Sequence, residues 1–325
     1  MDFVTIADLN EDILNGLYKI PKDIDLIVGI PRSGMLVATI IALYMNKPLT
    51  DIDGYIRGDY YSSGNTKNTS NNIASFEEVK KVLIVEDSSH SGKSVREAKE
   101  KLENVHPAIQ KMFFAAYVTD DSKKNVDIWL KVLNDRIFEW NYMHHAILAE
   151  ACVDIDGILC VDPTPEENDD GEKYLIFLRN AKPKYMPTRK IGYLVTSRLE
   201  KYRAETETWL KENGIEYGQL IMLDGVTAEQ RKKMGNHGEF KAKVYKSIPE
   251  ARLFIESEPS QAGTISEISH KDVFCPQGSL FFKESKMRLY KRCAKKRIHE
   301  VVYRIASKLP GYQSWKHVVK KYLKR

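Results

Sequence analysis

Short apolar runs alternate with segments of helical periodicity along most of this chain, and this alternation is the strongest constraint on its fold. In the first half we predict strands at residues 25–30, 47–56, 81–85 and 111–119, and helices at residues 33–46 and 94–105. Strands that alternate with helices favour a parallel sheet, because each helix returns the chain to the edge where the next strand begins. The sequence therefore predicts an α/β fold.

A second alternating series begins near residues 144–149. It contains an apolar run that ends in acids before Gly157, predicted strands at residues 190–198, 217–223 and 251–257, and a predicted helix at residues 199–214. A chain of 325 residues is long enough for two cores of ordinary size. We expect one domain over residues 1–145, a second over residues 146–280 and a tail over residues 281–325.

Positive charge is concentrated in that tail. The chain has a net charge of +5, but residues 281–325 alone carry 15 Lys or Arg and only two Glu. Apolar residues recur there at helical spacing and predict two amphipathic helices, with Ile298, Val301, Val302, Ile305 and Leu309 in one and Tyr312, Trp315, Val318, Val319, Tyr322 and Leu323 in the other. Such helices fit an anionic membrane surface. The alternative is that they pack on the protein body; nucleic-acid binding is not expected, because no recognised fold supports it.

The remaining global features point to the cytoplasm. The four cysteines have no paired spacing, so neither a disulfide framework nor a zinc site is predicted. The N-terminus has no basic region followed by an apolar core, and hence no predicted signal peptide. The longest apolar run, residues 35–45, is too short to span a bilayer. We expect a cytoplasmic protein, with peripheral contact to the inner face of the membrane if the tail binds lipid.

The stretch VEDSSHSGKS, residues 85–94, ends like a nucleotide-binding P-loop, but that pattern requires a glycine where Asp87 stands. Glu86 and Asp87 would repel a triphosphate, whereas carboxylates accept hydrogen bonds from sugar hydroxyls. The small residues that follow, together with the start of the next helix, suit a phosphate. The stretch therefore predicts a ribose 5-phosphate site; the alternative is an ordinary acidic turn.

This arrangement resembles the phosphoribosyl pyrophosphate (PRPP) signature of type I phosphoribosyltransferases, with Glu-Asp where Asp-Asp is commoner and with an unusual His90. The resemblance implies that Glu86 and Asp87 bind the ribose hydroxyls. It implies that the 5-phosphate is bound by Ser88, Ser89, His90, Ser91, Gly92, Lys93 and Ser94, although Lys93 suits a solvated helix position better.

Two further segments extend this resemblance. The stretch VGIPRSGM resembles the loop that binds pyrophosphate, and it implies contacts from Arg32, Ser33 and Gly34. Residues 57–72 resemble the active-site hood, with Arg57 and Lys67 as phosphate contacts. The base that activates the acceptor is left open between Asp53 and Asp59.

A second pair of acids, Asp154 and Asp156 in the stretch DIDG, also follows a predicted strand. Two carboxylates at this spacing can divide the work of phosphate transfer, one as nucleophile and the other as proton donor. This is the signature of the haloacid dehalogenase (HAD) superfamily of phosphatases. The resemblance implies that Thr196 binds the phosphoryl group. It implies that the motif lysine is Lys241 or, less favoured, Lys243. It also implies that Mg²⁺ is held by Asp154, Asp156 and Glu256, with Glu258 as the less favoured alternative to Glu256.

The spacing of these motifs limits the cap over the phosphatase site. Only 42 positions separate Asp154 from Thr196, so any inserted cap is small. In this superfamily a small cap implies bulky substrates.

Together the two signatures resemble the dual-domain ribofuranosyltransferases of bacterial surface polysaccharide assembly, of the O-antigen or capsule type. This resemblance implies two Rossmann-like parallel-sheet domains. It also implies that phosphoribose moves from PRPP to a glycan acceptor, which the tail suggests is lipid-linked, and that the phosphatase then removes the 5-phosphate. The first alternative is a nucleobase phosphoribosyltransferase fused to a 5′-nucleotidase for nucleoside salvage. The second is a regulator that senses PRPP.

Overall fold

The computed structural model describes residues 1–62, 73–224 and 237–283. The chain divides into two compact units, Met1–Trp140 and Asn141–Arg325. Lys67 of the predicted hood and the predicted amphipathic helices of the tail lie outside the described residues. None of the helices in the described ranges combines the length and apolar character needed to cross a membrane.

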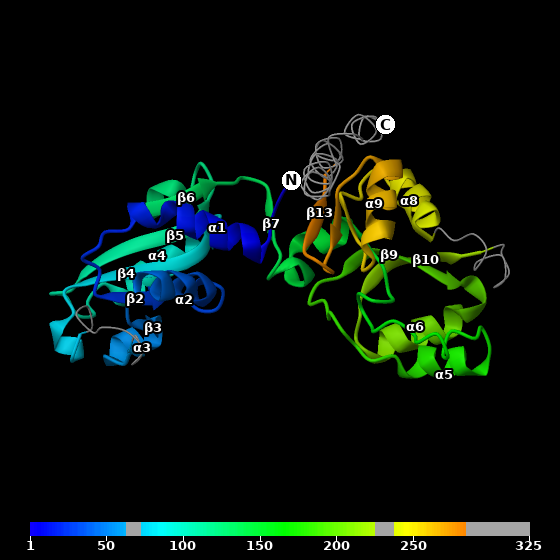
Figure 1. The fold of residues 1–325 in the computed structure, drawn as a ribbon, viewed down its shortest axis with the longest axis horizontal. Helices are drawn as coiled ribbons and strands as arrows, with labels where there is room; N and C mark the ends of the chain where they lie inside the picture. The colour runs from blue at the N-terminus through cyan, green and yellow to red at the C-terminus, as the bar shows by residue number, and fades with distance from the viewer. Residues whose placement is uncertain (63–72, 225–236, 284–325) are drawn as a thin grey trace, which may run out of the picture. The chain divides into compact units, whose positions relative to one another are not determined.

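The first unit is built on a five-stranded parallel sheet of order β3-β2-β4-β5-β6 (Figure 1). Its strands are β2 (Leu26–Gly29), β3 (Leu49–Asp51), β4 (Lys81–Ser89), β5 (Gln110–Val118) and β6 (Ile128–Val132). Its helices are α1 (Ile6–Gly16), α2 (Gly34–Met45), α3 (Ile52–Arg57) and α4 (Lys93–Leu102). A separate parallel pair joins β1 (Asp2–Val4) to β7 (Arg136–Phe138).

Alternate residues of β4 enter two different apolar clusters. Leu83 and Val85 pack in the cluster that includes residues of α1 and α2, whereas Val82 and Ile84 pack in the cluster that includes residues of α3 and α4. Successive side chains of a strand point to opposite faces of its sheet, so the sheet is covered on both faces. This explains why the central strands read as continuous apolar runs.

Two predicted boundaries in this unit are wrong. The strand predicted over residues 47–56 ends at Asp51, because Asp51 caps a helix instead: its Oδ1 accepts a hydrogen bond from the Gly54 amide at 2.6 Å. The strand predicted over residues 81–85 continues to Ser89, so the turn before α4 is shorter than expected. The elements α1, β1, β6 and β7 were not predicted.

The second unit contains a six-stranded sheet of order β10-β9-β8-β11-β12-β13, parallel except for β13. Its strands are β8 (Ala151–Val153), β9 (Ile191–Leu199), β10 (Tyr217–Leu223), β11 (Leu253–Ile255), β12 (Val273–Cys275) and β13 (Leu280–Phe282). Its helices are α5 (Glu172–Asn180), α6 (Arg203–Glu212), α8 (His237–Ser247) and α9 (Pro259–Ser269). Because β8 lies between β9 and β11, the residues that follow these three strands meet at one edge of the sheet.

Short 3-10 helices complete the description of both units. They span Leu17–Lys19, Phe76–Glu78, Lys123–Asn125, Tyr142–His144, Ala146–Glu150 and Glu200–Tyr202.

Candidate active sites

In the first unit, the turn at residues 31–34 lies directly against the acidic end of β4. A Cβ atom on Gly34 would lie 2.6 Å from the Val85 carbonyl oxygen and 3.2 Å from Glu86 Oε1. Only glycine permits this approach, so Gly34 fixes the distance between the two predicted PRPP-binding segments. Arg32, whose peptide bond with Pro31 is cis, is exposed, and Ser33 is half-buried. The fold therefore brings these two segments, distant in sequence, into contact.

The two acids of this site are both buried, Glu86 with 5% and Asp87 with 7% of its surface exposed. The Asp87 amide donates a hydrogen bond to Glu86 Oε1 at 3.0 Å. Burial, and after it the hydrogen bond and charge of Asp87, raises the pKa of Glu86 to about 8. At neutral pH the Glu86 carboxyl is therefore mainly protonated.

Arg136 of β7 supports the loop after these acids, and sequence reasoning missed it. Its buried guanidinium donates to Ser88 Oγ at 3.1 Å and to the Leu133 carbonyl at 2.9 Å, and one of its nitrogens lies 3.3 Å from His90 Nδ1. No local motif marks this arginine, which lies 48 positions after Ser88. It reaches the loop only because β7 pairs with β1.

Side chains that follow β5 and start α4 bind three successive carbonyl oxygens of the loop. Ser122 Oγ donates to Ser89 O at 2.5 Å, Thr119 Oγ1 to His90 O at 3.1 Å, and Arg96 to Ser91 O at 2.8 Å. Gly92 adopts a positive φ of 74° just before α4. Side chains from outside the loop thus hold the backbone of the segment that is predicted to bind a phosphate.

Other predicted residues of this unit lie at its surface. Lys93 is exposed and pairs with Glu97 at 3.6 Å, as expected for a solvated helix residue. Asp53 contacts Lys101 at 2.5 Å, and Asp59 contacts Arg57 at 2.8 Å. The hydrogen bond from Lys101 lowers the pKa of Asp53, which weakens it as a base. The assignment of Asp53 or Asp59 as the acceptor-activating base stays a prediction.

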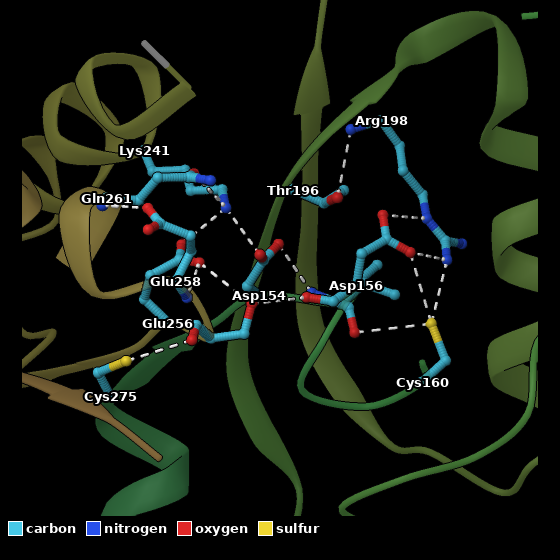
Figure 2. Close-up of polar contacts among 12 residues, drawn as sticks. Asp154, Asp156, Cys160, Thr196, Arg198, Lys241, Glu256, Glu258, Gln261 and Cys275 are labelled. Atoms are coloured by element: carbon cyan, nitrogen blue, oxygen red, sulfur yellow. Dashed lines mark hydrogen bonds and ion pairs between the residues drawn. The ribbon is translucent and has the colours of Figure 1, made fainter. Parts of the chain in front are cut away.

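In the second unit, four predicted residues meet where the strands end (Figure 2). Asp154 follows β8, Thr196 lies in β9, Lys241 lies in α8 and Glu256 follows β11. The Lys241 ammonium donates to Asp154 Oδ2 and to Glu256 Oε2, each at 2.7 Å, and all three side chains are at most 6% exposed. Lys243, by contrast, is exposed.

Two carboxyls share this one ammonium in a buried environment. Burial, reinforced by the charges of Glu256 and Asp156, raises the pKa of Asp154 although Lys241 opposes the shift. Burial would lower the pKa of Lys241, but the two carboxylates outweigh it and raise that pKa. Lys241 is therefore a permanent cation beside the predicted nucleophile, where it can hold a transferring phosphoryl group.

Asp156 has a different partner, Arg198, which sequence reasoning also missed. The guanidinium, whose side chain is fully buried, donates to Asp156 Oδ1 at 2.6 Å and to Oδ2 at 3.1 Å. Burial acts to raise the pKa of Asp156, but the charge and hydrogen bonds of Arg198 outweigh it and hold the pKa below its ordinary value. A sequence signal existed: Arg198 is two positions after Thr196 in β9, so both face the same side of the sheet.

The predicted metal ligands do not form one cluster. Among the described residues, no group of three His, Cys, Asp or Glu side chains is placed to hold a metal ion. The reason is that Lys241 lies between Asp154 and Glu256, while Arg198 occupies the carboxylate of Asp156. Glu258 caps α9, accepting from the Gln261 amide at 2.7 Å. The available donors, the carboxylates of Asp154 and Glu256 and the main-chain carbonyl of Asp156, are oxygens of the kind Mg²⁺ prefers, so the magnesium site stays a prediction.

These residues line a cavity of about 320 Å³. The lining includes Asp162 and Asn168, from the segment between β8 and α5, as well as Asp154, Asp156, Thr196, Lys241 and Glu256. The only helix between β8 and β9 that is longer than a single turn is α5, which agrees with a small cap.

Comparison with known proteins identifies the first unit. Residues 4–147 match the family model described as the phosphoribosyl transferase domain. This part of the chain is a phosphoribosyl transferase domain. The match ends at residue 147, so the interpretation of the second unit depends on its own geometry. Among proteins of curated function, none matches the chain.

Three solved structures are distantly similar to this chain. A xanthine-guanine-hypoxanthine phosphoribosyltransferase from Helicobacter pylori shares 16% identity over 43% of this chain and 92% of its own, with a TM-score of 0.33. A purine phosphoribosyltransferase from Pyrococcus horikoshii shares 19% identity over 43% and 94%, with a TM-score of 0.31. An orotate phosphoribosyltransferase from Aeropyrum pernix shares 14% identity over 38% and 68%, with a TM-score of 0.27. At these identities and TM-scores, the substrates of the three proteins do not indicate the substrate of this chain.

Proposed function

We propose that this chain transfers ribose in two steps: phosphoribosyl transfer from PRPP to a glycan hydroxyl, followed by removal of the 5-phosphate. The observation that carries the proposal is the presence of two different acid pairs in one chain. Glu86 and Asp87 lie in the phosphoribosyl transferase domain, and Asp154 and Asp156 lie beside buried cations in the second unit.

The first step needs a site that binds ribose hydroxyls, a 5-phosphate and a pyrophosphate together. The buried acids, the fixed loop from Ser88 to Gly92 and the adjoining turn at Arg32 supply these functions in one place. Pyrophosphate leaves C1 of the ribose, and the acceptor oxygen bonds to C1 as its proton passes to a carboxylate or water. Hydrogen bonds donated by the ribose hydroxyls would favour the ionised form of Glu86, which in turn binds them more strongly.

The second step uses Asp154 as nucleophile. One of its carboxylate oxygens bonds to phosphorus, the bond from phosphorus to the ribose 5-oxygen breaks, and Asp156 gives that oxygen a proton. Water then cleaves the phosphoaspartate and returns a proton to Asp156. Arg198 favours the carboxylate form of Asp156, which suits proton uptake in the second half of this cycle. The protonated form that donates in the first half is therefore the minor one. Lys241 and Thr196 hold the phosphoryl group.

Magnesium, when bound by the oxygens of Asp154, Asp156 and Glu256, would neutralise phosphate charge at this site. At the first site, Mg²⁺ would likewise neutralise the charge of the pyrophosphate group of PRPP.

A glycan acceptor is favoured over a nucleobase by the organisation of the chain. The small cap leaves the second site open to a bulky phosphorylated product. The basic, apolar tail of residues 281–325 suits a peripheral position at the cytoplasmic face of a membrane, where lipid-linked glycans are assembled.

Product analysis tests the whole proposal. The protein is incubated with PRPP, Mg²⁺ and either glycan or nucleobase acceptors, and products are weighed by mass spectrometry. We expect the glycan to gain the mass of an anhydropentose without phosphate. Formation of a nucleoside in the incubation with nucleobase would instead support the alternative function, a nucleobase phosphoribosyltransferase fused to a 5′-nucleotidase.

Two variants separate the steps. Asp154→Asn should still release pyrophosphate and should accumulate the phosphoribosylated glycan; if pyrophosphate release also stops, the division of labour between the units is wrong. Asp87→Ala should abolish transfer and leave hydrolysis of ribose 5-phosphate intact, and an unchanged transfer rate would refute the assignment of the PRPP site.

A further inference from the structure

Asp162 occupies a fixed position at the cavity of the second unit. The turn that precedes it is held against residues 182–185, since the Val161 amide donates to Lys182 O at 3.0 Å and the Lys184 amide to Leu159 O at 2.8 Å. Gly157 in this turn has a φ of 77°, and a Cβ atom there would lie 2.9 Å from Asp162 Oδ2. Asp162 itself is exposed and lies in a segment without helix or strand, and these main-chain hydrogen bonds keep its carboxylate close to the backbone at Gly157.

Asp162 is the lining carboxylate without a partner. Asp154 and Glu256 are bound by Lys241, Asp156 is bound by Arg198, and Glu258 caps α9. Within the described ranges, Asp162 makes no hydrogen bond or ion pair, although it lines the same cavity. The charge of Lys184, whose ammonium donates to the Gly157 carbonyl oxygen at 2.8 Å, acts on Asp162 without forming an ion pair with it. A carboxylate has about four acceptor positions, and those of Asp162 can therefore accept from a ligand.

The rest of the cavity suits a sugar better than an aromatic base. Among the described residues that line the cavity, Tyr174 and His237 are the aromatic ones. Tyr174 is 2% exposed and is packed against Phe177 and Tyr202. Tyr174 therefore offers no open ring face on which a base could stack, and such stacking is the usual sequence-tolerant way to hold one. Polar side chains, among them Asn168 and Gln277, form most of the remaining wall.

We propose that Asp162 accepts a hydrogen bond from a hydroxyl of the leaving sugar and makes this site selective for phosphorylated polyols. The inference rests on the proposed phosphatase function and adds its substrate class and a specificity-determining residue. Asp162 is not required for the chemistry at phosphorus, because Asp154, Asp156 and Lys241 supply it. Its loss should penalise only substrates that carry a hydroxyl near the phosphoester.

The test compares two substrates of the full-length protein with Mg²⁺: ribose 5-phosphate, and p-nitrophenyl phosphate, which has no sugar hydroxyl. Asp162→Ala should lower kcat/KM for ribose 5-phosphate roughly ten- to hundredfold, as expected for loss of a hydrogen bond to a charged group. Its kcat/KM for p-nitrophenyl phosphate should be unchanged. Asp162→Asn, which keeps one acceptor oxygen, should lie between Asp162→Ala and the unmodified protein.

Glu166→Gln is the matched control, because it removes a negative charge from the same segment at an exposed position that does not line the cavity. It should affect neither substrate. An equal loss on both substrates in Asp162→Ala, or no loss on either, overturns the assignment. If the unmodified protein hydrolyses neither substrate, the proposed phosphatase function is wrong, and the proposed role of Asp162, which rests on that function, is wrong too.

Discussion

The indole N–H of Trp140 donates a hydrogen bond to Asp87 Oδ2 at 2.8 Å. The same ring stacks on Phe138, with a centroid distance of 4.7 Å and an interplanar angle of 11°. One predicted ribose-binding carboxylate is thus oriented by a side chain 53 positions later. The end of the first unit, beyond the PRPP signature, takes part in shaping its site.

Removing this donor should weaken PRPP use without unfolding the unit. Trp140→Phe keeps an aromatic ring for the stack on Phe138 but leaves Asp87 without its N–H partner. Because a hydrogen bond to a charged group contributes about 1.5–3 kcal/mol, kcat/KM for PRPP should fall at least roughly tenfold. Pyrophosphate release measures this loss.

A second half-buried tryptophan of the same unit, Trp129, supplies the control. Trp129→Phe should leave pyrophosphate release near that of the unmodified protein. Equal rates in the two variants would show that Trp140 does not position Asp87 for ribose.

The protonation of Glu86 predicts a pH-dependent effect on stability. The pKa of Glu86 rises from an ordinary 4.5 to about 8 on folding, so the folded chain binds more protons than the unfolded chain between these values. The contribution of Glu86 to stability is therefore fully present below pH 4.5 and is lost as pH rises through about 8. Glu86→Gln, which stays neutral, should gain in Tm relative to the unmodified protein as pH increases from 5 to 8.

Thermal unfolding followed by circular dichroism across this pH range measures the difference. Glu103→Gln, at an exposed position of the same unit, should show no such trend. A Tm difference for Glu86→Gln that does not change with pH would mean that the folded carboxyl is already ionised at pH 5.

Residues that directly follow a strand could be placed from the sequence, whereas their supports could not. Asp154 and Glu256 follow apolar runs, and the ends of adjacent parallel strands meet at one edge of a sheet, which makes their proximity foreseeable. Arg136 reaches Ser88, and Trp140 reaches Asp87, from β7 and the residues just after it. Strand β7 pairs with β1, a contact between segments about 130 positions apart that no local pattern indicates. At Asp51 the sequence prediction failed for a local reason: its side chain caps a helix and so ends a run of residues whose pattern predicts a strand.

Lys241 should be essential for phosphatase activity, whereas Lys243 should not. Lys241→Met fills a similar volume but leaves Asp154 and Glu256 facing each other without a cation, so kcat should fall roughly 10²- to 10³-fold. The free energy of unfolding should fall by about 3 kcal/mol, because a buried charge loses its partner. Hydrolysis of p-nitrophenyl phosphate and denaturant unfolding provide the two measurements.

Lys243→Met removes an equal charge two positions away on the same helix, at an exposed site. It should change neither quantity appreciably. If Lys243→Met instead abolished activity while Lys241→Met did not, the phosphate site would lie elsewhere in this unit.

Arg198 and Asp156 should behave as one functional unit in hydrolysis. Arg198→Lys keeps a positive charge but cannot make both hydrogen bonds to the carboxylate, so Asp156 loses its fixed orientation and kcat should fall roughly tenfold or more. Asp156→Asn should cost at least as much, because it removes the proton-transferring group. The double variant should then be no worse than Asp156→Asn alone, since residues that act together are strongly non-additive. Arg203→Lys is the control, because it alters an arginine that pairs with Glu200 and Glu207 outside the cavity, and it should retain full activity. If the losses of the two single variants add in the double variant, Arg198 acts independently of Asp156.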